Sequence, residues 1–119
     1  MSALFIFITI ALTVYGQLSL KWHMDRAGQM PVEMIPAAIF IVKQLLSPLV
    51  ISSFGSAFLA SLTWMAALTK MPLSTAYPFM SLAFPLVAIL SVPLFHEQMT
   101  LMKAGGTALI LAGLFLLSR

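Results

Sequence analysis

Charged side chains are scarce in this sequence: only 8% of its 119 residues are Asp, Glu, Lys or Arg. Soluble domains carry about 25%. Hydrophobic residues make up 61% of the chain and the mean hydropathy is +1.07, so the composition excludes an ordinary soluble protein and indicates an integral membrane protein. Because the chain is short, we expect one compact unit that covers residues 1–119.

Cysteine is absent, which excludes disulfides, thiolate nucleophiles and cysteine-based metal sites. His23 and His96 lie in separate polar segments without a third ligand, so no metal site is predicted. The carboxylates of Asp25, Glu33 and Glu97 lack the paired spacing that acid–base catalysis uses. We therefore predict neither an enzyme nor a cofactor. The net charge of +3 is too small for nucleic-acid binding and is typical of lysines that flank membrane spans.

Four apolar runs predict an all-α integral membrane protein with a four-transmembrane-helix bundle, because a helix needs about 20 apolar residues to cross a bilayer. These runs cover residues 3–20, 48–69, 73–95 and 101–117. The segment between the first two begins as a polar loop, at 21–33. Residues 33–46 then form an apolar stretch of about 14 residues, which is too short to span. We predict a short interfacial or re-entrant helix there; the alternative is an extension of the next span, broken at Ser47 and Pro48.

The run at 73–95 combines apolar length with helix-breaking residues. Proline removes a backbone donor and kinks a helix, which membranes tolerate where hydroxyl side chains or neighbouring helices satisfy the freed carbonyls. A broken span with hydroxyl groups predicts a helix that lines a cavity rather than a plain anchor. The prolines in and beside this run are Pro72, Pro78, Pro85 and Pro93, and its polar residues are Ser74, Thr75, Tyr77 and Ser81.

Polar residues near the end of the first run are candidates for contact with a ligand. An amide inside a span should face the bundle, so Gln17 either forms an interhelical hydrogen bond or contacts a substrate headgroup. Lys21 lies one turn later on the same helical face, and it either extends to the lipid headgroups or binds a phosphate. Tyr77 is either a packed aromatic or a cavity-lining residue opposite Gln17, together with Ser81. Glu97 follows the third run, where we expect a helix cap or an ion pair with a basic neighbour.

Small residues lie along one side of the last run, and they predict a packing seam. The sequence leaves open whether the seam lies within one bundle or between two subunits. The seam consists of Ala104, Ala108 and Ala112, spaced by four, with Gly106 and Gly113, spaced by seven.

Several local patterns occur in order along the whole chain. They are Gly16-Gln17-Leu18 with Lys21, Ala76-Tyr77-Pro78 with Ser81-Leu82, FHEQMT at 95–100 and AGGTALILAGLFLLSR at 104–119. In this order and spacing, the chain resembles the four-helix members of the drug/metabolite transporter superfamily. It is most similar to the EamA-like small proteins and to the paired subunits that flip aminoarabinose-linked undecaprenyl phosphate. The resemblance implies a transporter of the bacterial inner membrane, and a structural role for the acidic residue at position 97.

The small multidrug exporters of the same superfamily carry a glutamate in their first span that binds protons and cations alternately. When their glycine and lysine are aligned with Gly16 and Lys21, that glutamate falls on Thr13. No Asp or Glu lies elsewhere in the first run, and this difference argues against cation/proton antiport.

We predict a transporter that translocates a lipid-linked or phosphate-bearing amphiphile, such as a polyprenyl phosphate, across the bacterial inner membrane. The predicted substrate-binding residues are Thr13, Gln17, Lys21, Tyr77 and Ser81. Alternating access usually needs two repeats, and this chain supplies one, so we expect a homodimer or a heterodimer with a similar four-helix protein. The alternatives are an accessory or scaffold subunit that does not transport, and a small cation exporter without the usual acidic residue.

Overall fold

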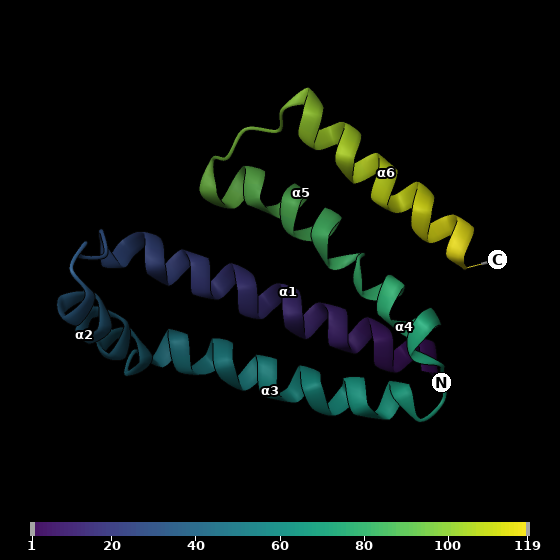
Figure 1. Cartoon of the computed structure of the whole chain (residues 1–119), viewed down its shortest axis with the longest axis horizontal. Coiled ribbons are helices and arrows are strands. Elements are labelled where there is room, and N and C mark those ends of the chain that lie inside the picture. Colours follow the sequence, from purple (N-terminus) through teal and green to yellow (C-terminus); the bar gives the residue numbers. More distant parts are fainter. Residues whose placement is uncertain (1, 119) are drawn as a thin grey trace.

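Six helices form the described part of the chain, residues 2–118, in the computed structural model (Figure 1). Met1 and Arg119, the ends of the predicted domain, lie outside the described residues. No strand occurs within 2–118, so the prediction of an all-α chain is confirmed. The helices are α1 (Ser2–Ala27), α2 (Met34–Leu45), α3 (Pro48–Leu68), α4 (Leu73–Met80), α5 (Ala83–Phe95) and α6 (Leu101–Leu117).

Three segments are long and apolar enough to cross a membrane, namely Ala3–Ala27, Pro48–Leu68 and Leu73–Phe95. The last of these combines α4 and α5. α6 is apolar but has only 17 residues, at the lower limit for a span. Figure 1 shows α1 between α3 on one side and α4 and α5 on the other, with α6 outermost beside α5.

α1 extends further than predicted, and the expectation of a loop from residue 21 onward is wrong. Local side-chain pairs stabilise the additional turns: the Lys21 ammonium lies 2.9 Å from the Asp25 carboxylate, at i,i+4 spacing. The Arg26 guanidinium lies over the Trp22 ring, 4.6 Å from its centroid. The helix ends before Gly28, whose φ of +95° belongs to the left-handed region that glycine adopts without strain.

α1 and α3 pack closely because small residues line their interface. A Cβ atom on Gly16 would lie 3.2 Å from the Ser53 carbonyl oxygen, so the two backbones nearly touch there. Ser56 donates a hydrogen bond to the Leu12 carbonyl at 2.6 Å, and the Ser19 and Ser53 hydroxyls are also 2.6 Å apart. These hydroxyl groups find partners without water, as a helix interface in lipid requires.

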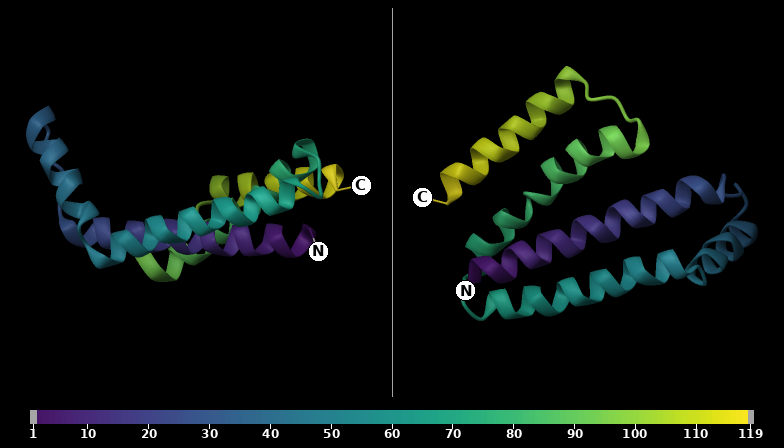
Figure 2. Two further views of the ribbon diagram at one scale, coloured as in Figure 1. Left: turned by 90° about the horizontal axis from the view of Figure 1, so that it is seen from below. Right: turned by 180° about the vertical axis from the view of Figure 1, so that it is seen from behind.

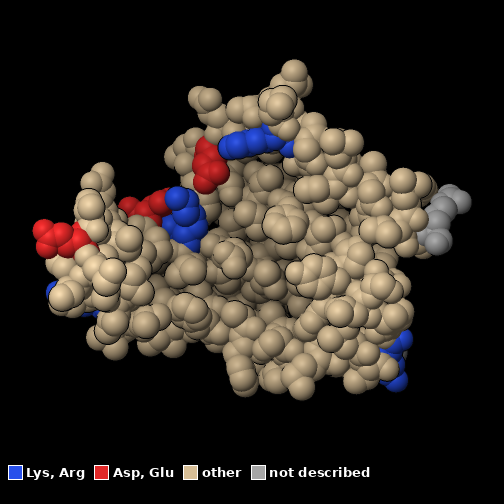
Figure 3. Space-filling model, viewed as in Figure 1, with Lys and Arg blue, Asp and Glu red and all other residues tan. Residues whose placement is uncertain are grey.

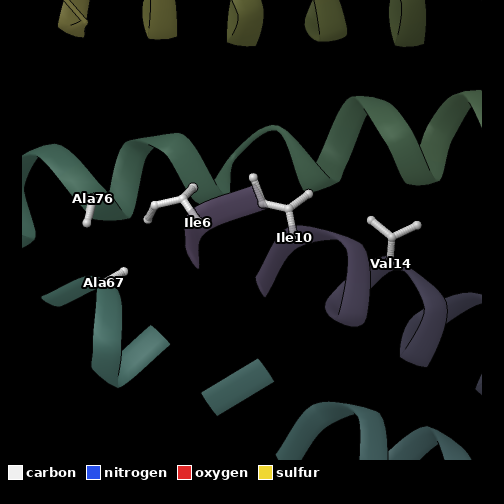
Figure 4. Close-up of a cluster of buried hydrophobic side chains, with 5 residues drawn as sticks. All are labelled: Ile6, Ile10, Val14, Ala67 and Ala76. Carbon is white, nitrogen blue, oxygen red and sulfur yellow. The ribbon is translucent and has the colours of Figure 1, made fainter. Parts of the chain in front are cut away.

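A small apolar core joins α1 to α3 and α4 (Figure 4). Ile6, Ile10 and Val14 follow each other at four-residue spacing, so they share one face of α1. In Figure 4 these three side chains point towards the α4 and α5 ribbon. Ala67 from α3 and Ala76 from α4 complete the cluster, and both are fully buried. This contact fixes the start of the broken segment against the first helix.

The segment 73–95 is broken, as its prolines predict. α4 ends at Met80 and α5 begins at Ala83. Pro85 has no N–H to donate to the carbonyl of Ser81, so the hydrogen-bond ladder cannot continue regularly through the junction. The Ser81 carbonyl instead accepts from the Phe84 N–H at 3.1 Å, and the Ser81 hydroxyl donates to the Pro78 carbonyl at 2.5 Å.

α2 is a short helix that ends at Leu45, and α3 begins at Pro48. This break fits both the predicted separate helix and the alternative of an extended second span broken at Ser47 and Pro48. The left view of Figure 2 shows α2 projecting away from the layer that the other helices form. None of its residues is buried. His23 of α1 attaches its end to the bundle, because the ring Nε2 lies 2.6 Å from the Gln44 side-chain oxygen.

α6 is the least buried of the long helices, and within it only Leu114 is buried. Space is open beside the glycines of this helix. A Cβ built on Gly105, Gly106 or Gly113 would have no other helix within 4 Å. The predicted packing seam is therefore not occupied within the described part of this subunit. The loop before α6 begins at His96, which has a left-handed φ of 56° and ends α5 sharply.

Candidate functional site

A cavity of about 950 Å³ lies between α1, α3, α4 and α5 and extends to the loop before α6. Figure 3 shows this face of the molecule hollowed at its centre, with acidic and basic side chains at one side of the hollow. The volume is at the upper end of the usual range for small-molecule sites. Its polar lining residues are Thr9, Thr13, Gln17, Ser61, Tyr77, Ser81, Ser91, Glu97, Gln98 and Lys103.

The wall from α1 contains two of the predicted residues. Thr13 and Gln17 lie four residues apart, on one face of the helix, and both line the cavity. They also line a smaller pocket of about 140 Å³ against α3. Among residues 2–118, no hydrogen bond involves the Gln17 amide, so the predicted alternative of an interhelical lock is not seen there. The amide is available for a ligand.

The opposite wall contains two further predicted residues. Tyr77 of α4 and Ser81 at its end line the same cavity as Gln17. The Tyr77 ring contacts Trp64 of α3 edge to face, with 6.2 Å between centroids, and Trp64 also lines the cavity. Tyr77 is 68% exposed in the single subunit, so most of its ring is accessible from the cavity or from lipid.

Lys21 is placed apart from the other four predicted residues. It is not among the residues that line the cavity, and its ammonium is 2.9 Å from Asp25, on the exposed end of α1. Lys21 follows Gln17 by one helical turn, as predicted. Asp25 lies one further turn along α1, and its carboxylate forms an ion pair with the Lys21 ammonium.

Two charged residues of the cavity wall were not predicted as site residues. Glu97 and Lys103 line one end of it, beside Gln98. Lys103 donates from Nζ to the Gln98 carbonyl at 3.3 Å, and its backbone N–H donates to the Thr100 hydroxyl that caps α6. Neither role predicted for Glu97 is seen within residues 2–118: Thr100 caps α6, and Lys21–Asp25 is the one ion pair.

The side chains of the cavity wall can bind a ligand. Most of the wall between the helices is apolar, with hydroxyl and amide groups distributed along it, and the two charged groups lie at one end. Within the described residues, no group of three His, Cys, Asp or Glu side chains is close enough to hold a metal ion. Such a wall can replace the hydration shell of a polar headgroup with donors and acceptors.

Comparison with known proteins gives a consistent result. Residues 1–119 match the EamA-like transporter family. A probable 4-amino-4-deoxy-L-arabinose-phosphoundecaprenol flippase subunit ArnF from Serratia proteamaculans is 36% identical, over 92% of this chain and 86% of the relative. The proteins of the same name from Pseudomonas fluorescens and Aeromonas hydrophila are 35% and 34% identical, and the matches cover 78% and 74% of them. They cover 88% and 92% of this chain. No solved structure matches the chain.

Proposed function

The chain belongs to the EamA-like transporter family, and we propose that it is one subunit of a flippase for a lipid with a phosphate-bearing headgroup. It is an integral protein of the bacterial inner membrane, and its relatives are named as flippase subunits rather than enzymes. The observation that supports the proposal best is the cavity of about 950 Å³, which four of the five predicted residues line from two sides.

The proposed path keeps the headgroup in the cavity and the polyprenyl tail in lipid. Moving a phosphate through hydrocarbon without partners would cost many kcal/mol, because its hydration is lost. Thr13, Gln17, Tyr77 and Ser81 supply hydroxyl and amide groups that replace part of this hydration. Lys21 lies one helical turn beyond Gln17 and would attract the phosphate as it approaches from the membrane surface. Its exposed pair with Asp25 is weak enough to exchange for a phosphate.

We propose that α6 is the fourth span and that α2 lies at the membrane interface. The 17 residues of α6 give about 26 Å of helix, close to the thickness of the hydrocarbon core. α2 follows the polar end of α1, and its apolar side chains Ile35, Ile39 and Val42 are all exposed. Its single cation, Lys43, suits a position at the headgroups.

We propose further that two subunits associate through the small-residue seam of α6. Its glycines have open space beside them, and small residues let membrane helices approach closely. Gly106→Leu and Gly113→Leu should each shift the protein from dimer to monomer, as measured by cross-linking at several detergent-to-protein ratios. Gly55→Leu is the matched control, because Gly55 on α3 also has open space around it. Equal dimerisation in all three variants would exclude the seam as the contact between two subunits.

Exchange of a labelled lipid between leaflets is the direct test of the transport function. Proteoliposomes that contain this chain, alone or with a similar four-helix partner, should accelerate the exchange of an aminosugar-linked polyprenyl phosphate over empty vesicles. No acceleration in either preparation would exclude the flippase, and stable co-purification with one larger membrane protein would then favour the accessory role. Proton-coupled uptake of a quaternary cation would instead support an exporter, although no carboxylate lies on the α1 wall.

A further inference from the structure

The charged end of the cavity is built from two residues of opposite sign. Glu97 lies in the loop after α5, and Lys103 lies in the first turn of α6. Both line the cavity, and they are the only acidic and basic residues that do so among residues 2–118. Figure 3 shows charged side chains of both signs close together at one side of the hollow.

These two side chains form no direct ion pair, since Lys21–Asp25 is the single pair with a nitrogen–oxygen distance within 4.0 Å in the described chain. The one side-chain bond of Lys103 is a 3.3 Å contact with the Gln98 carbonyl, which leaves two ammonium protons for other acceptors. Both side chains are exposed. A ligand can therefore contact each group separately.

A carboxylate and an ammonium group that are both available complement a ligand that carries the opposite pair. Charge-assisted hydrogen bonds are about twice as strong as neutral ones, so each group favours its own counterpart. An anion alone would gain from Lys103 but would be repelled by Glu97. A cation alone would be attracted by Glu97 but repelled by Lys103. The pair thus selects a headgroup with both charges and disfavours one with a single charge.

We infer that Glu97 and Lys103 form a two-charge recognition site for a zwitterionic headgroup, in which Glu97 binds an ammonium group and Lys103 binds a phosphate. This inference rests on the proposed flippase function and adds to it the residues that select the headgroup. Thr13, Gln17 and Tyr77 line the same cavity and add hydroxyl and amide groups that can hydrogen-bond the phosphate and the sugar.

Binding can be measured with Trp64 as the reporter, because it lines the cavity and is one of only two tryptophans. A Trp22→Phe background removes the other. The full chain in detergent is titrated with three probes that share a decyl tail: an aminopentose phosphodiester, its N-acetylated form, and the aminopentose glycoside without phosphate. The background protein should bind the first probe about tenfold more tightly than either of the others.

Each variant should remove one preference and keep the other. Glu97→Gln should bind the free-amine and N-acetylated phosphodiesters equally, while it still prefers both to the glycoside. Lys103→Gln should lose the preference for phosphate and keep that for the free amine. Glu33→Gln and Lys43→Gln are matched controls, since both positions are exposed and neither lines the cavity. They should change neither preference.

If each variant loses a different preference, the cause is a lost contact with the headgroup and not misfolding, because a misfolded protein would bind all three probes more weakly. The inference is overturned if both preferences survive in Glu97→Gln and Lys103→Gln, if the variants lose all binding equally, or if the zwitterionic probe is not preferred at all. Accelerated lipid exchange alongside any of these results would leave the flippase function standing. Absence of exchange would remove that function and this inference together.

Discussion

Replacing Gly16 with leucine is expected to prevent stable folding. A single Cβ at this position would already lie 3.2 Å from the Ser53 carbonyl oxygen, and a leucine side chain would drive α1 and α3 apart. Overpacking costs typically 1–3 kcal/mol. The separation would also break the contacts of Ser19 with Ser53 and of Ser56 with Leu12, so we expect a total loss of about 3 kcal/mol or more. Thermal unfolding in detergent measures the change.

Gly55→Leu is the control for this prediction, because it makes the same substitution on α3 where no atom lies within 4 Å. It should unfold at about the wild-type temperature. Gly16→Ala should give a small loss, since the Ser53 carbonyl needs to move by only a few tenths of an ångström. A Gly16→Leu protein that is as stable as wild type would show that the two helices are not in close contact at this point.

Gln17→Leu is expected to reduce the rate of lipid translocation by about ten- to a hundredfold while leaving the protein folded. Leucine has a similar size but removes the amide, and a hydrogen bond to a charged phosphate contributes about 1.5–3 kcal/mol. The fold should tolerate the change because the amide makes no hydrogen bond within residues 2–118. Leaflet exchange in proteoliposomes and thermal unfolding in detergent give the two measurements.

Gln44→Leu provides the matched comparison. Its amide lies outside the cavity, and its side-chain oxygen accepts a hydrogen bond from His23 Nε2 at 2.6 Å, so its loss should lower stability and spare translocation. If Gln17→Leu instead lowered stability and left the exchange rate unchanged, the amide would have a structural role and the headgroup contact would be excluded.

Much of the fold could be predicted from local features. The length of the apolar runs predicts α3, α6 and the start of α1, and the prolines in and beside 73–95 predict a broken helix there without giving the position of the break. The end of α1 is not predictable in this way, because the polar residues at 21–27 are also typical of a loop. In the structure, pairs such as Lys21 with Asp25 keep those residues helical until Gly28 ends the helix.

The neutral part of the candidate site was also predictable, for two physical reasons. Thr13 and Gln17 follow the helical period, so they had to share a face, and the break beside Ser81 indicated which helix would line a cavity. The charged end was not predictable in this way. Whether Glu97 and Lys103 reach the cavity depends on the path of the loop between α5 and α6, which no local pattern records.

The break between α4 and α5 has a mechanical consequence. At 1.5 Å per residue, the 8 residues of α4 are about 12 Å long and the 13 residues of α5 are about 20 Å long, so neither half crosses the hydrocarbon core alone. A continuous helix would transmit any tilt from one membrane face to the other. Here the junction at Ser81 divides it into two short helices, so a tilt of α5 need not be transmitted to α4, which Ala76 holds in the core against α1 and α3.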